Sequence, residues 1–223
     1  VRDHLNQHAP RAMCVMQPLR LTLTNLPQPL LLMVPNHPAD SAFGGRELVM
    51  DSELYIDQAD FREEANKQFK RLVLGKRVRL RGGLVIEGES CEKDADGNIV
   101  HVLARCVTSV PGTDPEDGVK PKGVIQWVSA EHGLPATIRC YDRLFAVPEP
   151  GRGDDTLAAL NPQSLELVAG AMVEPGLREA EPEQAFQFER EGYFVADRYD
   201  HTSENPVFNM TIGLRDTWSA TNA

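Results

Sequence analysis

Short runs of alternating apolar and polar residues, separated by turn signals, constrain this chain more than any other feature of its sequence. Leu19 to Thr24 reads LRLTLT, and farther along Val78 and Leu80 alternate with arginines. A period of two is typical of a β-strand with one buried face. Many short strands of this kind predict an all-β chain built as barrels or sandwiches.

Strands are expected along the whole chain. Besides the two above, they are Leu30 to Val34, Glu53 to Ile56, Leu84 to Ile86, Asn98 to Cys106, Gly123 to Val128, Ala136 to Phe145, Ser164 to Val168, Ala185 to Glu189, Gly192 to Ala196 and Pro206 to Gly213. Asp96-Gly97-Asn98 predicts a hairpin turn. Gly112 to Lys122 is rich in Pro, Gly and charge, which predicts a long loop or linker.

Helices are expected in only a few places. The main one runs from Asp60, as N-cap with Glu63 completing a capping box, to Gly75 as the C-terminal glycine. Its apolar residues recur at helical spacing: Phe61, Ala65, Phe69, and Leu72 or Val73. A short helix should end before Pro10, and Asp154-Asp155 should cap a brief one.

Several function classes lack their usual sequence signals. No apolar run approaches the roughly 20 residues of a membrane helix. The four cysteines form no CxxC pair and the six histidines are scattered, so no metal site is predicted. Nucleotide-binding and nucleophile motifs are absent, so no catalytic residue is assigned. The chain begins at Val1 without an initiator Met, which we interpret as a fragment of a longer protein.

The distribution of charge points to a polyanion, although the net charge is −10. Seven basic residues and no acidic one lie between Lys67 and Arg81, whereas Gly151 to Ala223 holds five basic and thirteen acidic residues. A local positive field matters to a polyanion more than the total charge. On a strand, Arg77, Arg79 and Arg81 would form a row spaced by about 6.6 Å. The alternative is a solvated face paired with acidic neighbours.

A second candidate segment is Phe186 to Phe194, FQFEREGYF. Alternation places its phenylalanines inward, with Gln187 and Glu189 outward beside a tight turn. Glutamine can both donate to and accept from base edges. An ordinary polar strand face is the alternative that these residues alone favour.

Seven segments carry a resemblance to a known family. They are Ala9 to Met13, Pro35 to Pro38, Asp60 to Arg81, Gly123 to Trp127, Tyr141 to Phe145, Phe186 to Phe194 and Val207 to Trp218. Through them the chain resembles, nearly end to end, the C-terminal anticodon-binding region of bacterial glutaminyl-tRNA synthetases. Between Cys14 and Arg46 it is less typical of that family, apart from Pro35 to Pro38.

The resemblance implies two β-barrels of a kind also found in one ribosomal protein family. It divides the chain into a lead-in segment (1–18), a first barrel (19–116) and a second barrel (117–223). It also implies contacts to the anticodon. Arg11, Gln187, Glu189 and Arg190 would surround the middle base, Lys70 and Arg71 would serve the third base with Gln68 nearby, and Arg79 and Arg81 would serve the first. Arg11 and Gln187 must then meet near the junction of the barrels.

The resemblance further implies a cytoplasmic monomer that binds glutamine tRNA, and neither DNA nor a membrane. ATP, magnesium and glutamine would be used by a catalytic domain of the same parent ligase, with no cofactor in this fragment. Two alternatives stay open: a non-enzymatic ribosome-associated RNA-binding barrel protein, and the anticodon region of a related glutamyl-tRNA synthetase.

Overall fold

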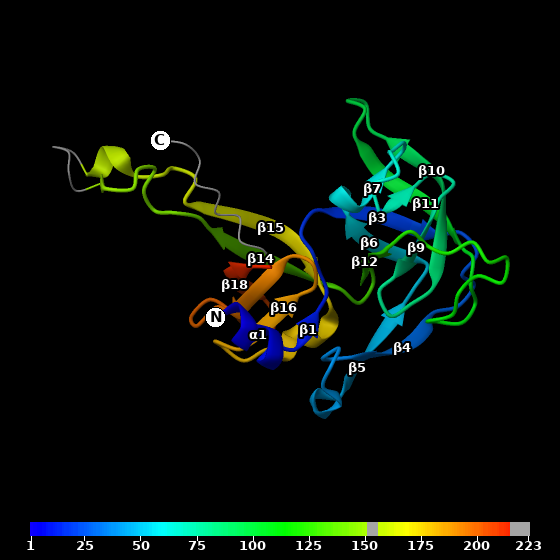
Figure 1. Ribbon diagram of the computed structural model, residues 1–223, viewed down its shortest axis with the longest axis horizontal. Coiled ribbons are helices and arrows are strands. Elements are labelled where there is room, and N and C mark those ends of the chain that lie inside the picture. The colour runs from blue at the N-terminus through cyan, green and yellow to red at the C-terminus, as the bar shows by residue number, and fades with distance from the viewer. Residues whose placement is uncertain (151–155, 215–223) are drawn as a thin grey trace.

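The computed structural model describes residues 1–150 and 156–214 (Figure 1). About 44% of the chain is strand and 11% helix, arranged in two barrel-like sheets, which confirms the predicted all-β fold. Figure 1 shows two bodies side by side. A long ribbon of β14 (Leu134–Tyr141) and β15 (Leu165–Val173) reaches out of one body, and a hairpin of β4 (Leu30–Pro35) and β5 (Gly45–Met50) reaches out of the other. Among the described residues, no helix is long and apolar enough to span a membrane.

The first sheet has seven strands and is nearly closed. In sheet order they are β12 (Val124–Ile125), β9 (Arg77–Leu80), β10 (Val85–Lys93), β11 (Ile99–Cys106), β3 (Pro18–Leu23), β6 (Glu53–Asp57) and β13 (Val128–Ser129). Only Gln126 and Trp127 separate the two edge strands, β12 and β13, in sequence. The short segment 124–129 therefore pairs with β9 at one end of the sheet and with β6 at the other. The Trp127 side chain is fully buried there, and its indole N–H donates to the carbonyl of Arg81 at 2.9 Å.

The second sheet is a half-barrel, and its two edge strands are again almost adjacent in sequence. Its order is β1 (Arg11–Ala12), β16 (Ala185–Phe188), β17 (Gly192–Ala196), β18 (Val207–Gly213), β14 (Leu134–Tyr141), β15 (Leu165–Val173) and β2 (Cys14–Val15). Here Met13 alone separates the edge strands. Stacked and edge-on phenylalanines fill the core between β16, β17 and β18.

The segment 11–15 belongs to both cores. Met13 and Val15 pack into the first, whereas Ala12 and Cys14 pack into the second. Successive side chains of a strand point to opposite faces, so alternate residues of this segment enter different cores. The backbone N–H of Cys14 donates to the side chain of Gln126 at 3.2 Å, which joins the two closing segments to each other.

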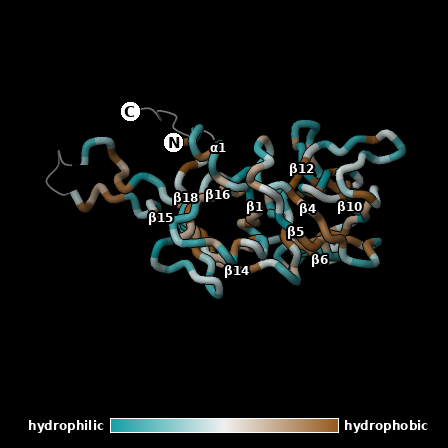
Figure 2. Tube along the Cα trace, turned by 90° about the horizontal axis from the view of Figure 1, so that it is seen from below, coloured by the Kyte–Doolittle hydropathy of each residue, from teal (hydrophilic) through white to brown (hydrophobic). Residues whose placement is uncertain are grey.

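Smaller elements surround the sheets. They are α1 (Arg2–His8), β4 (Leu30–Pro35), η1 (Ser41–Phe43), β5 (Gly45–Met50), η2 (Gln58–Asp60), β7 (Phe61–Arg62), β8 (Leu72–Val73), η4 (Leu157–Ala159) and η5 (Pro175–Glu179). In Figure 2 hydrophobic positions gather where β4, β5 and β6 lie together. Strand β5 was not predicted, whereas the short helix before Pro10 is confirmed as α1.

The predicted helix from Asp60 to Gly75 is wrong. The segment instead runs through η2, β7 and a turn to β8, and Phe61 pairs with Leu72 in parallel register. Phe61 and Leu72 are buried in the first core, but Ala65 is exposed, so no helical stripe forms. Glu63 binds Lys93 at 2.6 Å rather than capping a helix. Tertiary packing overrides the local helical propensity here.

Most predicted strands are confirmed within a residue or two. Val78 and Leu80 are buried between half-buried arginines, and β10 and β11 form the expected hairpin with Gly97 at a φ of 85°. The boundary after residue 116 stays a prediction, although β12 and β13, which follow it, hydrogen-bond to the first sheet. Asp154 and Asp155, and the part of the Val207 to Trp218 segment beyond residue 214, lie outside the described residues.

Candidate RNA-binding surface

The structure brings Arg11 and Gln187 together at the junction of the two bodies. Strands β1 and β16 are parallel, with Arg11 opposite Gln187. The N–H of Gln187 donates to the carbonyl of Pro10 at 2.9 Å, and the N–H of Glu189 donates to that of Ala12 at 3.1 Å. The expected meeting of these distant segments is therefore confirmed, while their roles toward a base stay predictions.

Three hydrogen bonds fix the position of the Arg11 side chain at this junction. Its guanidinium donates to the carbonyl of Ala9 at 2.8 Å, and to the carbonyl and the side-chain oxygen of Asn6 at 3.1 and 2.8 Å. Burial lowers the pKa of Arg11 from its usual value, although Tyr193 and Glu189 act in the opposite direction. The cation remains fully charged, and it caps the carbonyls at the end of α1.

Gln187 carries an unsatisfied acceptor beside Arg11. Its side-chain oxygen is buried and has no hydrogen-bond partner among the described residues. A buried amide oxygen without a partner costs free energy, so it points to a donor supplied from outside the chain. A nucleobase edge offers such a donor.

The row of arginines on β9 and just after it is present, but each arginine has an acidic partner. Arg79 binds Asp114 at 2.7 Å and the carbonyl of Thr113 at 2.9 Å. Arg81 binds Glu189 at 2.8 Å, across the junction. The partners lie on segments outside the acid-free stretch, so no local pattern could indicate them.

Arg77 is the most strongly paired of the row. It binds Glu87 and Asp117, each at 2.7 Å. Its guanidinium, together with the backbone N–H of Val119, lowers the pKa of Asp117 to about 2. Arg77 was not assigned to a base, and its two carboxylates fit a structural role.

The basic residues near the start of the Lys67 to Arg81 stretch line a cavity of about 740 Å³. Gln68, Lys70 and Arg71 lie on its wall, together with Gln58, Ala59, Phe61, Arg62, Phe69 and Gln17. The Arg62 guanidinium lies 4.6 Å from the centre of the Phe69 ring. Gln68 and Lys70 are exposed, and the part of the chain that the structure describes gives the Lys70 ammonium no partner. An amide, an aromatic ring and cations around one hollow can receive an unstacked base.

Asp60 connects this cavity to the second body. Both oxygens of its buried carboxylate accept from Arg190, at 3.0 and 3.1 Å, and one also lies 3.2 Å from Nε of Arg71. Arg190 stands in the β16–β17 turn with a φ of 71°, and it also donates to the carbonyl of Val124 at 3.2 Å. The sequence assigned Asp60 to a helix cap and gave no signal of this contact.

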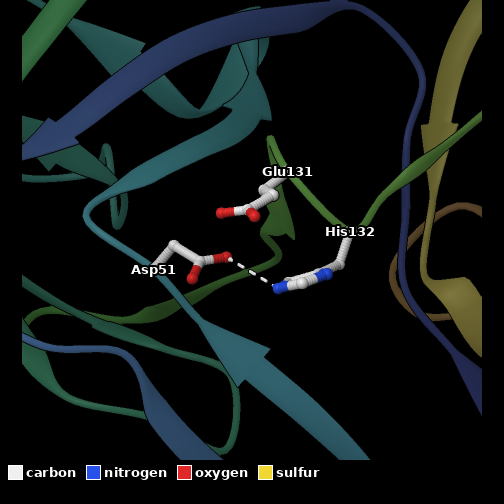
Figure 3. Close-up of side chains that lie close together, drawn as sticks. All are labelled: Asp51, Glu131 and His132. Atoms are coloured by element: carbon white, nitrogen blue, oxygen red, sulfur yellow. Dashed lines mark ion pairs between the residues drawn. The ribbon is translucent and has the colours of Figure 1, made fainter.

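A separate cluster brings three potential metal ligands together (Figure 3). Ligand atoms of Asp51, Glu131 and His132 all lie within 4.8 Å of one another. The Asp51 carboxylate accepts a hydrogen bond from the hydroxyl of Ser129. The hydroxyl oxygen of Ser129 in turn accepts from the backbone N–H groups of Glu131 and His132. These bonds explain the cluster as a turn, and the absence of a metal site stays a prediction.

The two sheets bring polar groups from segments distant in sequence to one junction. Models of the anticodon-binding domain of class I tRNA synthetases, E and Q, match residues 9–107 and 124–197. The chain belongs to this family.

Relatives named glutamine–tRNA ligase match almost the whole chain. The protein of Tolumonas auensis is 55% identical over 98% of this chain, and that of Serratia proteamaculans is 52% identical over 100%. The Escherichia coli K12 protein is 52% identical over 98%. In each case the chain spans 40% of the relative's length.

Proposed function

We propose that this chain is the anticodon-binding region of a glutamine–tRNA ligase and grips the anticodon loop of glutamine tRNA. The observation that carries the proposal is the register of Arg11 against Gln187, whose side-chain oxygen awaits a donor. Arg81, which directly follows β9, binds Glu189 of the same segment as Gln187, and Arg79 lies two residues before it on β9. Gln68, Lys70 and Arg71 line the cavity, where Arg71 shares Asp60 with Arg190. Glu189 and Arg190 link these two groups to the junction.

The whole protein would attach glutamine to this tRNA at the expense of ATP. ATP and magnesium would act in a catalytic domain outside these residues, and a cytoplasmic monomer serving translation fits the role. The names of the relatives support glutamine over glutamate. They also favour a ligase over a non-enzymatic ribosome-associated protein.

RNA would bind here by exchanging ion-pair partners. Arg79 and Arg81 each hold a carboxylate that a phosphate or base can replace, which limits the gain from charge alone. Selectivity would then depend on groups shaped to a base, above all Gln187. Backbone contacts to phosphates still give a steep dependence of affinity on salt.

Equilibrium binding of anticodon stem-loops tests the proposal. We expect the chain to bind a stem-loop with the glutamine anticodon CUG more tightly than one with CAG, in which only the middle base differs. Gln187→Ala should remove about tenfold of that preference, because the hydrogen bonds of one amide discriminate by about 1–3 kcal/mol.

The control is Gln163→Ala, which alters an amide on the distant β14–β15 ribbon. Equal affinity of the wild-type chain for the CUG and CAG stem-loops would refute the proposal. Tighter binding of a glutamate stem-loop with the anticodon CUC would favour the glutamyl enzyme instead.

A further inference from the structure

One buried carboxylate lies between two arginines that come from different sheets. Asp60 is 3% exposed and ends η2 beside the first sheet. Arg71 precedes β8 of the same body, whereas Arg190 belongs to the β16–β17 turn of the other. We propose that Asp60 is a positioning residue that couples Arg71 to Arg190, so that recognition of the third and middle anticodon bases is linked. This inference rests on the proposed function.

The geometry around Arg190 is specific to this contact. A backbone φ of 71° is unusual for a residue other than glycine or asparagine. Such backbone strain persists only where the surrounding structure imposes it. Two nitrogens of the guanidinium donate to the Asp60 carboxylate, and one of them also donates to the carbonyl of Val124. Arg190 is therefore oriented by the first body although its backbone lies in the second.

The charges at this point do not balance pairwise. The single carboxylate of Asp60 binds two guanidinium groups, those of Arg190 and Arg71. Burial raises the pKa of Asp60, although both arginines act to lower it. The neighbouring acids are Asp57 and the half-buried Glu191, and burial also raises the pKa of Glu191. Two cations that share one acceptor compete for it, so a ligand that draws on one of them changes how tightly the other is held.

The coupling follows from that competition. The Arg71 side chain lines the cavity and is 37% exposed, so it can turn toward a base at the third anticodon position. Arg190 would then hold Asp60 alone, which tightens the contact between the bodies beside Gln187 and Glu189. Binding at the middle base would become more favourable when the third base is correct.

A double-mutant cycle measures this coupling. Arg71→Ala, Arg190→Ala and the double variant are titrated with stem-loops carrying CUG, CUA (third base changed) and CAG (middle base changed). We expect the effects of the two substitutions on selectivity to be non-additive by about threefold or more, as for residues that share a partner. In the Asp60→Asn background the two effects should become additive.

Glu64→Gln is the matched control. It removes the same charge from an exposed position on the same segment, and it should leave the non-additivity intact. Additive effects in the wild-type background would overturn the inference, as would non-additivity that survives in Asp60→Asn. If Asp60→Asn does not fold, the wild-type cycle alone decides. A wild-type chain that does not distinguish the three stem-loops would instead refute the proposed function.

Discussion

At the scale of single residues, the structure uses carboxylates as fixed acceptors. Asp197 shows this most clearly: it accepts from the side chains of Arg139 and Asn209 and from the backbone N–H groups of Tyr199 and Asp200. These donors, Asn209 first among them, lower the pKa of Asp197 to about 2. The ionised form is therefore the one that stabilises the turn between β17 and β18.

Asp197→Ala should lower the free energy of unfolding at pH 7 by about 2–3 kcal/mol, because several donors lose a charged acceptor. The folded pKa lies below the ordinary value, so this contribution is present above about pH 4 and is lost as the pH falls toward 2. Urea unfolding at pH 7 and pH 3 measures the difference. Asp200→Ala, at an exposed partner of Arg139, should cost much less. An equal loss at both pH values would contradict this account.

At the scale of elements, short tertiary contacts decide more than local propensity does. The segment from Asp60 to Gly75 carries good helical signals, yet burying Phe61 and Leu72 in one core requires an extended path. No sequence pattern announces that choice. The closing segment 11–15 is equally hard to recognise, because strands of two residues show no period. A strand was predicted from Gly123 to Val128, but not its division into β12 and β13, which lie at opposite edges of one sheet.

Trp127→Ala should destabilise the chain strongly, since it empties the closing point of the first sheet. The change removes the largest fully buried side chain and its bond to Arg81, at an expected cost of about 3–5 kcal/mol. Trp127→Phe should cost less and retain the fold. Chemical denaturation followed by circular dichroism gives both values, and a loss below about 1 kcal/mol for the alanine variant would contradict the closing role.

The loop between β11 and β12 should act as a competitor for RNA. Asp114 occupies Arg79, so Asp114→Asn should raise the affinity for a CUG stem-loop by roughly two- to fivefold. Glu116→Gln removes the same charge from the same loop without a described contact to an arginine. Titration of both variants separates loss of the competitor from loss of general repulsion, and equal gains would argue against competition.

The sequence predicted much of the fold and part of the site. Alternation identified β3, β9 and β16, because a strand with one buried and one exposed face has apolar residues at every second position. The family resemblance brought Arg11 and Gln187 together, which no local pattern could do. The acidic partners of Arg79, Arg81 and Arg190 could not be predicted, since each lies on an element distant in sequence.

At the scale of the whole molecule, the two bodies are joined by shared structure rather than by a free linker. The segment 11–15 contributes side chains to both cores. Within residues 1–150 and 156–214, three ion pairs also cross the junction: Arg46–Glu174, Arg81–Glu189 and Arg190–Asp60. The Glu174 carboxylate is buried and also accepts the N–H of Met13 at 2.9 Å.

We therefore expect both sheets to unfold in one transition. Because Met13 and Cys14 lie on opposite sides of one strand path, neither core can lose this segment alone. Scanning calorimetry should give a calorimetric enthalpy close to the van't Hoff enthalpy. Two resolved transitions would mean that the junction is weaker than these contacts indicate.

In the proposed function, widely separated segments of the chain form one anticodon-reading surface. Hydrogen exchange of the chain with and without a CUG stem-loop tests it most directly. We predict protection in three regions together, around residues 9–12, 66–81 and 185–191, with a smaller effect from a CAG stem-loop. Protection that is confined to one region, or that is the same for both stem-loops, would contradict the account.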